Sequence, residues 1–297
     1  MHQEAYDAAE GLRRSDLWLI HKSPAHFKAA MDTPETEPSA SLIFGIAVHK
    51  YILEPDTFSD EYEIAPKVDK RTKAGKEEWA KFTEKCETEN KEPLDEATFA
   101  VIKQMAEAVK NNPLAVELLT GKHETEWYWE DPLTGEKVKA KCDNITVYDG
   151  KQYIVDYKTT DSCEDGHFER SVKKYGYQFQ AGFYTSGVSI NTGENYGFAF
   201  VAQEKKPPFA CRVYLCSDEF VKQGQLQYHE LLNKYHTCKI TNNWWGYEGD
   251  TPKPTMLLDD SERFASKTNK SINLHSFRSD SYLDDDYEEP EEDWSDV

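Results

Sequence analysis

The sequence predicts an α/β (α+β) fold in which helices flank a central mixed β-sheet. Three segments with strand-like alternation follow one another between residues 126 and 157, separated only by turn sequences. Helical patterns precede and follow this region, and two further strand-like segments occupy 196–202 and 210–215. Hydrophobic residues make up 38% and charged residues 30% of the 297-residue chain, which is typical of a soluble globular protein.

The helices expected before the strands differ in how apolar they are. The segment 41–53 (SLIFGIAVHKYIL) is apolar nearly all round, so we expect it to be buried. His49 lies deep within this run, where it is either a core histidine or a ligand. The other helical patterns cover 15–20, 77–85 and 95–119, the last with a break near Pro113.

The three central segments are expected to form an antiparallel meander. They cover 126–130, 138–147 and 152–157. Turn sequences join them, DPLTG at 131–135 and YDGK at 148–151, and connections this short allow only antiparallel neighbours.

Helical patterns return after the meander and end before a different kind of sequence. They cover 164–174, 177–187 and 218–235, interrupted by the two later strand-like segments. We therefore expect one domain over 1–240, a C-terminal extension over 241–278 and a disordered acidic tail over 279–297.

The charge of the chain is unevenly distributed. Lys and Arg number 35 against 55 Asp and Glu, a formal net charge of −20, which by itself argues against a nucleic-acid partner. Ten of these acids lie in the last nineteen residues, so the first 278 residues carry −10. The tail serves solubility alone or competes electrostatically with DNA, and both interpretations stay open.

Several classes of protein are disfavoured by what the sequence lacks. The six cysteines include no C-x-x-C pair, which argues against a zinc site or an iron–sulfur cluster and favours reduced thiols. No apolar run is long enough to span a membrane, and the first fourteen residues have no apolar signal segment. We therefore expect a cytoplasmic protein with no membrane partner.

Two carboxylates and a lysine are the strongest candidates for chemistry. Asp143 and Asp156 lie on neighbouring strands of the expected hairpin and can face each other. Lys158 points to the same face as Asp156, because side chains two residues apart on a strand share a face. Two carboxylates suit Mg²⁺, and the lysine can position or deprotonate a water. A salt-bridged pair at a strand end is the alternative for Asp156 and Lys158.

Four motifs in order give this pattern a wider context. They are Gly45-x3-His49, Asp143, Asp156-Tyr-Lys158-Thr-Thr and Gln180-x3-Tyr184. With them the chain resembles the PD-(D/E)xK nuclease superfamily, and within it the RecB-like exonucleases. It is most similar to the RecE-type exodeoxyribonuclease domain (exonuclease VIII) in the start at 15–27, the basic loop at 71–76 and the DPLTG turn.

The resemblance implies a role for each matching residue. Lys158 is the expected catalytic lysine, with Asp156, Asp143, Gln180 and Tyr184 in the catalytic site. The expected metal ligands are His49, Asp143, Asp156 and the main chain of Tyr157, holding Mg²⁺ with Mn²⁺ as a substitute. Glu124 is an expected outer-sphere residue. Packing within one helix face is the alternative for Gln180 and Tyr184.

Basic residues mark the expected path of DNA. The segment 67–76 holds five bases and one acid, and is either a solvated loop or a contact for phosphates. Two further lysines precede Asp143 on its strand. The expected DNA-binding residues are Lys67, Lys70, Arg71, Lys73, Lys76, Lys139 and Lys141.

The function implied by the resemblance is Mg²⁺-dependent digestion of linear double-stranded DNA in the 5′→3′ direction, leaving 3′ single strands for recombination. Relatives form rings, which implies a homo-oligomer that encircles DNA ends and works with a single-strand annealing protein. Two alternatives remain open. One is a nuclease-fold DNA-binding or protein-interaction module regulated by its acidic tail, and the other is a structure-specific endonuclease.

Overall fold

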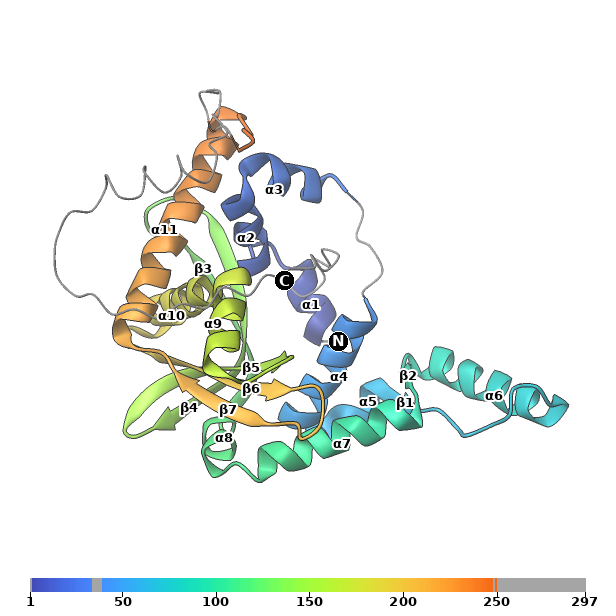
Figure 1. Ribbon diagram of the computed structural model, residues 1–297. Coiled ribbons are helices and arrows are strands. Elements are labelled where there is room, and N and C mark those ends of the chain that lie inside the picture. Colours follow the sequence, from blue (N-terminus) through green and yellow to red (C-terminus); the bar gives the residue numbers. More distant parts are fainter. Residues whose placement is uncertain (1, 34–38, 248, 250–297) are drawn as a thin grey trace, which may run out of the picture.

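A five-stranded mixed sheet in the order β3-β4-β5-β6-β7 forms the centre of the protein (Figure 1). The computed structural model describes residues 2–33, 39–247 and 249. The acidic tail and nearly all of the expected extension therefore lie outside the described residues, and the proposed domain boundaries stay a prediction. The strands are β3 (Lys122–Glu130), β4 (Lys137–Tyr148), β5 (Lys151–Thr160), β6 (Gly197–Glu204) and β7 (Cys211–Leu215).

The expected meander is confirmed, and the later strands make the sheet mixed. β3, β4 and β5 pair antiparallel, β5 and β6 pair parallel, and β6 and β7 pair antiparallel. The parallel pair is possible because the helices α9 (Asp165–Lys174) and α10 (Tyr177–Thr192) carry the chain back to the start of the next strand.

The two faces of β5 and β6 pack against different helices. Ile154, Phe198 and Phe200 face a core that includes α10. Their strand neighbours Val155 and Ala199 face a second core with α4 (Ala40–Leu53), α7 (Glu96–Lys110) and α8 (Pro113–Leu118). Because both faces are covered, β6 (GFAFVAQE) is apolar along most of its length and almost wholly buried.

Two glycines bring α10 against the long helix α11 (Asp218–Thr241). A Cβ on Gly182 would lie only 2.0 Å from the carbonyl carbon of Gly224, and a Cβ on Gly224 would lie 2.0 Å from the Gln178 carbonyl oxygen. The absence of side chains at these positions therefore allows the helix backbones to approach closely, which fixes α10 over the sheet. α2 (Arg14–Lys22) packs on α11 and completes this layer.

Short elements account for most of what the sequence patterns missed. These are α1 (His2–Ala8), α3 (Pro24–Met31), the 3₁₀ helix η1 (Pro55–Thr57), α5 (Phe58–Glu61), and the two-stranded parallel sheet of β1 (Tyr62–Ile64) and β2 (Glu92–Leu94). A strand of three residues has too few positions for alternation to be visible. Between β1 and β2, α6 (Lys73–Glu89) begins at Lys73, earlier than expected, with Thr72 as its N-cap.

The expectation that the helix over 41–53 is buried on all sides is wrong. In α4 the side chains of Ile43 and Ile46 are 41% and 49% exposed, whereas Ala47 and Val48 are fully buried. One apolar face therefore packs in the core, and the other is open. Ile46 of this open face lines the cleft described below, together with Leu42 and Gly45, whereas Ile43 does not.

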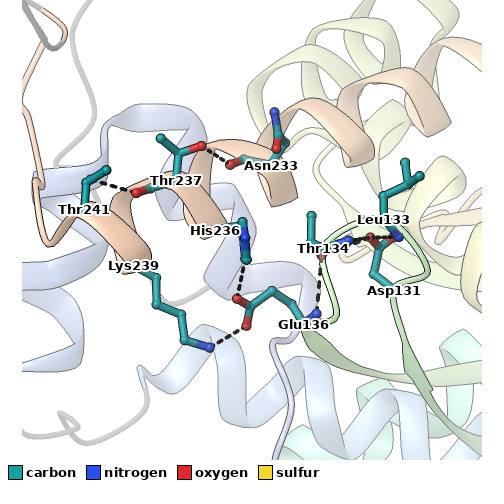
Figure 2. A network of polar contacts seen from close by, with 9 residues as sticks. All are labelled: Asp131, Leu133, Thr134, Glu136, Asn233, His236, Thr237, Lys239 and Thr241. Carbon is teal, nitrogen blue, oxygen red and sulfur yellow. Dashed lines mark hydrogen bonds and ion pairs between the residues drawn. The ribbon is translucent and has the colours of Figure 1, made fainter.

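A polar network ties the turn between β3 and β4 to α11 (Figure 2). Asp131 Oδ1 accepts hydrogen bonds from the main-chain N–H groups of Leu133 and Thr134, and Oδ2 accepts one from the Tyr228 hydroxyl. Glu136 binds two groups of α11: Oε1 lies 2.8 Å from His236 Nδ1, and Oε2 accepts from Lys239 Nζ at 2.6 Å. The buried carboxylates of this turn are thus fully partnered.

In the described part of the chain, no helix has the length and apolar character needed to cross a membrane.

Candidate active site

A cleft of about 1800 Å³ opens beside the end of β5. The open face of α4 and the α9 helix line it, together with residues of β3, β4 and β5. His49 and Lys158 are both among its lining residues. Residues far apart in the sequence therefore share one solvent-accessible space.

His49 joins two carboxylates from neighbouring strands. Its Nε2 lies 2.9 Å from Asp143 Oδ2 on β4, and its Nδ1 lies 3.5 Å from Glu124 Oε1 on β3. One ligand atom from each of these three residues lies within 4.8 Å of the others. The other Glu124 oxygen, Oε2, lies 2.6 Å from Lys141 Nζ.

Asp156 and Lys158 form the second half of the site. Asp156 is 2% exposed, and its Oδ2 lies 3.0 Å from Lys158 Nζ. Its Oδ1 accepts a 2.6 Å hydrogen bond from Gln180 Nε2 on α10. The expectation that the strand places Asp156 and Lys158 on one face is confirmed by this contact.

Strand register brings the two halves together. Asn144 pairs with Val155, so the antiparallel ladder carries Asp143 toward Asp156. The main-chain N–H of Tyr157 donates to Asp143 Oδ2 at 2.8 Å, which joins the strands at this point. Glu124 has a left-handed backbone with φ of 51° inside β3. Such a conformation costs a non-glycine residue about 1–3 kcal/mol and is concentrated at functional sites.

The charges of the site shift one another's pKa values. Burial raises the pKa of Asp156 to about 6, with Asp143 adding to the rise and Lys158 opposing it. Burial also opposes ionisation of Asp143, but the neighbouring His49 overcomes it and lowers the pKa of Asp143. Burial disfavours the His49 imidazolium, yet Asp143 and Glu124 raise the pKa of His49 to about 9.

The site contains buried polar atoms that the protein leaves without hydrogen-bond partners. Among the described residues these include Oε1 of Glu124 and Oε1 of Gln180. A buried oxygen without a partner is costly and is uncommon in native proteins unless an ion, water or ligand completes it. The donor set of carboxylate oxygens with one imidazole suits Mg²⁺ or Mn²⁺, so the residues fit a divalent metal.

The side chains of two expected site residues, Tyr157 and Tyr184, have contacts elsewhere in the structure. The Tyr157 side chain points away, donating its hydroxyl to Gln203, as strand alternation beside Asp156 requires. This leaves only its main chain available to the site. Tyr184 follows Gln180 by one helical turn and packs on Phe183 and Phe198.

The prediction that Lys139 binds DNA is wrong, because its side chain is buried in this structure and cannot reach DNA. It is 3% exposed, and its ammonium donates to the main-chain carbonyls of Tyr6, Asp7 and Ala9 at the end of α1. It therefore holds the N-terminal helix against β4. Lys141, two residues along the same strand, does line the cleft.

The expected DNA-binding segment 67–76 lies outside the lining of the cleft. Figure 1 shows α6, which begins within this segment, extending away from the central sheet. Lys70 stacks its ammonium over the Trp79 ring, and Lys73 lies 3.9 Å from Glu77. A role of this segment in DNA binding remains a prediction.

Comparison with protein families decides where the chain belongs. The model of a family described as a PDDEXK-like domain of unknown function (DUF3799) matches residues 14–251. The chain belongs to this PDDEXK-like family. The predicted superfamily and its mixed-sheet fold are thereby confirmed, and the PDDEXK-like assignment supports a nuclease.

A solved structure shares the fold of this PDDEXK-like protein. It is that of a candidate exonuclease from Eubacterium rectale, with a TM-score of 0.56 and 16% sequence identity, covering 84% of this chain and 91% of the other. A second structure is that of the protein SSO0001, which has 14% sequence identity and covers 72% of this chain and 84% of its own. Its TM-score of 0.27 is too low to indicate a shared fold. No curated protein matches the chain.

The sequence patterns undervalued two parts of the site. Glu124 was expected only as an outer-sphere residue, yet its carboxylate reaches the same cluster as His49 and Asp143. Its left-handed backbone has no sequence signal. Arg170 on α9 also lines the cleft and was not expected there. The amphipathic pattern DGHFERSVKK was a usable signal, since it places Arg170 and Lys174 on one helix face.

Proposed function

We propose that this PDDEXK-like protein is a metal-dependent exodeoxyribonuclease that digests linear double-stranded DNA in the 5′→3′ direction. The observation that carries the proposal is the convergence of Asp143 and Asp156 on three residues that line the cleft, His49, Glu124 and Lys158. Carboxylates can hold a divalent metal for phosphodiester hydrolysis, and a nearby lysine can stabilise negative charge on the phosphate.

In this proposal His49, Glu124, Asp143 and Asp156, with the Tyr157 main chain, hold Mg²⁺ or Mn²⁺. When bound, such an ion supplies a Lewis acid for phosphate oxygens and a water of lowered pKa. Glu124 is proposed here as a direct metal ligand, and not only as the outer-sphere residue expected from the sequence, because its buried Oε1 lacks a hydrogen bond in the described chain.

The other residues orient these groups. Gln180 holds Asp156 Oδ1, so the carboxylate is fixed in one rotamer. Asp156 in turn holds the Lys158 ammonium within 3.0 Å of its Oδ2. Although burial lowers the pKa of Lys158, Asp156 raises it overall, so the lysine is charged at neutral pH. A charged lysine can orient a water and stabilise negative charge on the phosphate in the transition state.

The finer parts of the proposal come from the likeness to RecE-type exonucleases. They are the 5′→3′ direction, generation of 3′ single strands for recombination, assembly into a homo-oligomeric ring and work with a single-strand annealing protein. The candidate exonuclease from Eubacterium rectale supports an exonuclease over an endonuclease, at low identity.

Digestion of linear duplex labelled at either the 5′ or the 3′ end tests the proposal. We expect Mg²⁺-dependent release of the 5′ label first and no digestion of covalently closed circles. Lys158→Ala is the control for the site. Cleavage of closed circles would favour the structure-specific endonuclease, and full activity of Lys158→Ala would reject the site assignment.

A further inference from the structure

The lysines and arginines that line the cleft differ in whether the protein pairs them with carboxylates. Four are paired within the described chain: Lys50 with Glu54 and Glu61, Lys141 with Glu124, Lys158 with Asp156, and Lys205 with Asp161. The other three, Arg170, Lys173 and Lys174, all belong to α9. None of these three forms an ion pair with a carboxylate of the described residues.

The three unpaired cations form one face of α9. Spacings of three and four residues place Lys173 and Lys174 one turn after Arg170, and all three side chains are exposed. Phe168, on the opposite face of the helix, is buried in the core and keeps the cations turned outward. Glu169 of the same helix is not among the residues that line the cleft. Like charges this close repel one another, so an anionic partner that neutralises them is favoured.

The last nineteen residues of the chain, 279–297, have the complementary charge. They contain ten Asp and Glu and no Lys or Arg. The basic segment 67–76 is a weaker match for them, because the protein already engages part of it. Lys70 lies over the Trp79 ring, and Lys73 lies 3.9 Å from Glu77. Charge complementarity therefore favours α9 as the surface that receives the acidic segment.

The end of the described chain is connected to α9 by two short helices. The Trp245 carbonyl accepts a hydrogen bond from the Ala25 N–H on α3. α3 packs on α2, whose Arg14 donates to the Tyr175 carbonyl directly after α9. Residues 250–278, which lead to the acidic segment, can span up to roughly 100 Å. This reach exceeds the length of about 36 Å of α11, the longest described helix.

We propose that residues 279–297 dock on the cationic face of α9 and thereby compete with DNA for the cleft. The carboxylates of the segment take the place of phosphates on Arg170, Lys173 and Lys174. Docking lowers the affinity for DNA, and duplex DNA, with one charge per about 1.7 Å of its axis, displaces the segment when DNA is abundant. The docking does not depend on hydrolysis, whereas its effect on DNA binding rests on the function proposed above.

Carbodiimide crosslinking of the full-length protein, without metal or DNA, tests the docking. This reagent joins a carboxylate to an amine that contacts it, and the ion pair of Lys151 with Asp218, at 2.7 Å, is the internal standard. At low salt we expect mass spectrometry to find acids of 279–297 joined to Lys173 or Lys174 within one chain. At about 1 M salt, where the Debye length is ~3 Å, these products should be lost.

Exposed lysines outside the cleft, Lys103 and Lys222, are the controls for this crosslinking and should not react with the segment. Products with residues 67–76 in place of α9, or products only between two chains, overturn the proposal. The absence of any product with α9, when the internal standard forms, also overturns it. Because no DNA is present, this result is independent of whether the protein is a nuclease.

A double-mutant cycle on DNA affinity tests the consequence of docking. One variant replaces the ten acids of 279–297 with Asn or Gln, and the other is Arg170→Gln/Lys173→Gln/Lys174→Gln. In metal-free buffer at low salt, neutralising the segment should lower the Kd for a duplex oligonucleotide by about fivefold with wild-type α9 and have little effect with neutral α9.

The matched control for the cycle is Lys103→Gln/Lys110→Gln/Lys222→Gln, which removes three charges outside the lining of the cleft and should keep the full gain in affinity. An equal gain in every background would mean that the segment acts only through the net charge of the chain, which contradicts docking on α9. No gain with wild-type α9 contradicts the competition with DNA. Neither measurement involves hydrolysis, so both are independent of the result for Lys158→Ala.

Discussion

Two clusters of carboxylates differ in how completely the protein satisfies their oxygens. One lies in the turn between β3 and β4, and the other lies on β3, β4 and β5 at the cleft. Asp131 and Glu136, in the turn between β3 and β4, have a partner for every carboxylate oxygen. Figure 2 shows the partners of Glu136 and of Asp131 Oδ1. In the cleft, Glu124 Oε1 and the supporting Gln180 Oε1 have no hydrogen bond within the described chain. The same residue types therefore serve stability in one place and are open to a ligand in the other.

The pKa values of Glu136 in the turn and of Asp156 at the cleft are shifted in opposite directions. Burial opposes ionisation of Glu136, but Lys239 and His236 overcome it and lower its pKa. At Asp156 burial prevails over Lys158 and raises the pKa to about 6. A raised carboxylate pKa means that the folded protein bears a cost for the charge at neutral pH. The turn gains stability from its acids, whereas Asp156, beside the cleft-lining Lys158, is an acid that a further cation would stabilise.

The largest expected effect is on hydrolysis. Lys158→Ala should reduce Mg²⁺-dependent digestion of linear duplex by about 100-fold or more, because it removes a charge positioned beside the reacting phosphate. Initial rates on labelled DNA measure the effect, and circular dichroism checks that the fold is kept. Glu136→Gln is the matched control, since it removes a buried carboxylate charge outside the cleft and should retain most activity.

Binding of a divalent metal should raise the stability of the folded protein, and this rise should depend on the cluster at the cleft. Saturating Mg²⁺ or Mn²⁺, at 100 times Kd, should stabilise the wild-type protein by about 2.7 kcal/mol, because the ion binds only the folded state. Thermal unfolding with and without metal measures this, with an expected rise in Tm of roughly 5 °C. Asp143→Asn should abolish the rise. A metal-dependent rise that survives in Asp143→Asn would place the ion elsewhere.

Loss of a partnered acid should lower stability directly. Glu136→Gln should cost about 1–3 kcal/mol at pH 7, because it removes the charge that His236 and Lys239 surround. The pKa of Glu136 is lowered by folding, so its contribution is present above the unfolded value of about 4.3 and is lost as pH falls further. Urea unfolding at several pH values checks this. A difference from wild type that grows toward acid would contradict the sign.

The smallest effect is expected for Glu124→Gln without metal. Its Oε1 forms no hydrogen bond, and its left-handed backbone is unchanged by the substitution. Its Oε2 lies 2.6 Å from Lys141 Nζ in a partly exposed pair, and the Gln side-chain oxygen can still accept from that ammonium, so stability should change by less than about 1 kcal/mol. Urea unfolding in metal-free buffer measures it beside Glu136→Gln. An equally large loss in both variants would mean that the two clusters are alike in holding the fold together.

Local patterns in the sequence predict the part of the site that depends on neighbouring strands. Alternation places Lys158 with Asp156 and sends the Tyr157 side chain away, and short turns set β4 beside β5. Lys139 was misassigned because a helix that the patterns missed, α1, covers that end of β4. The open face of α4 was also missed, because apolar residues that line a cleft look like core residues in sequence.

We expect the incompletely satisfied cluster at the cleft, and not the satisfied cluster of the turn, to perform Mg²⁺-dependent hydrolysis. The most direct measurement compares digestion of end-labelled linear duplex by the wild type, Asp143→Asn and Glu136→Gln under one Mg²⁺ concentration. We expect Asp143→Asn to be inactive while Glu136→Gln, although less stable, digests the duplex at close to the wild-type rate below its Tm. Full activity of Asp143→Asn would contradict the account.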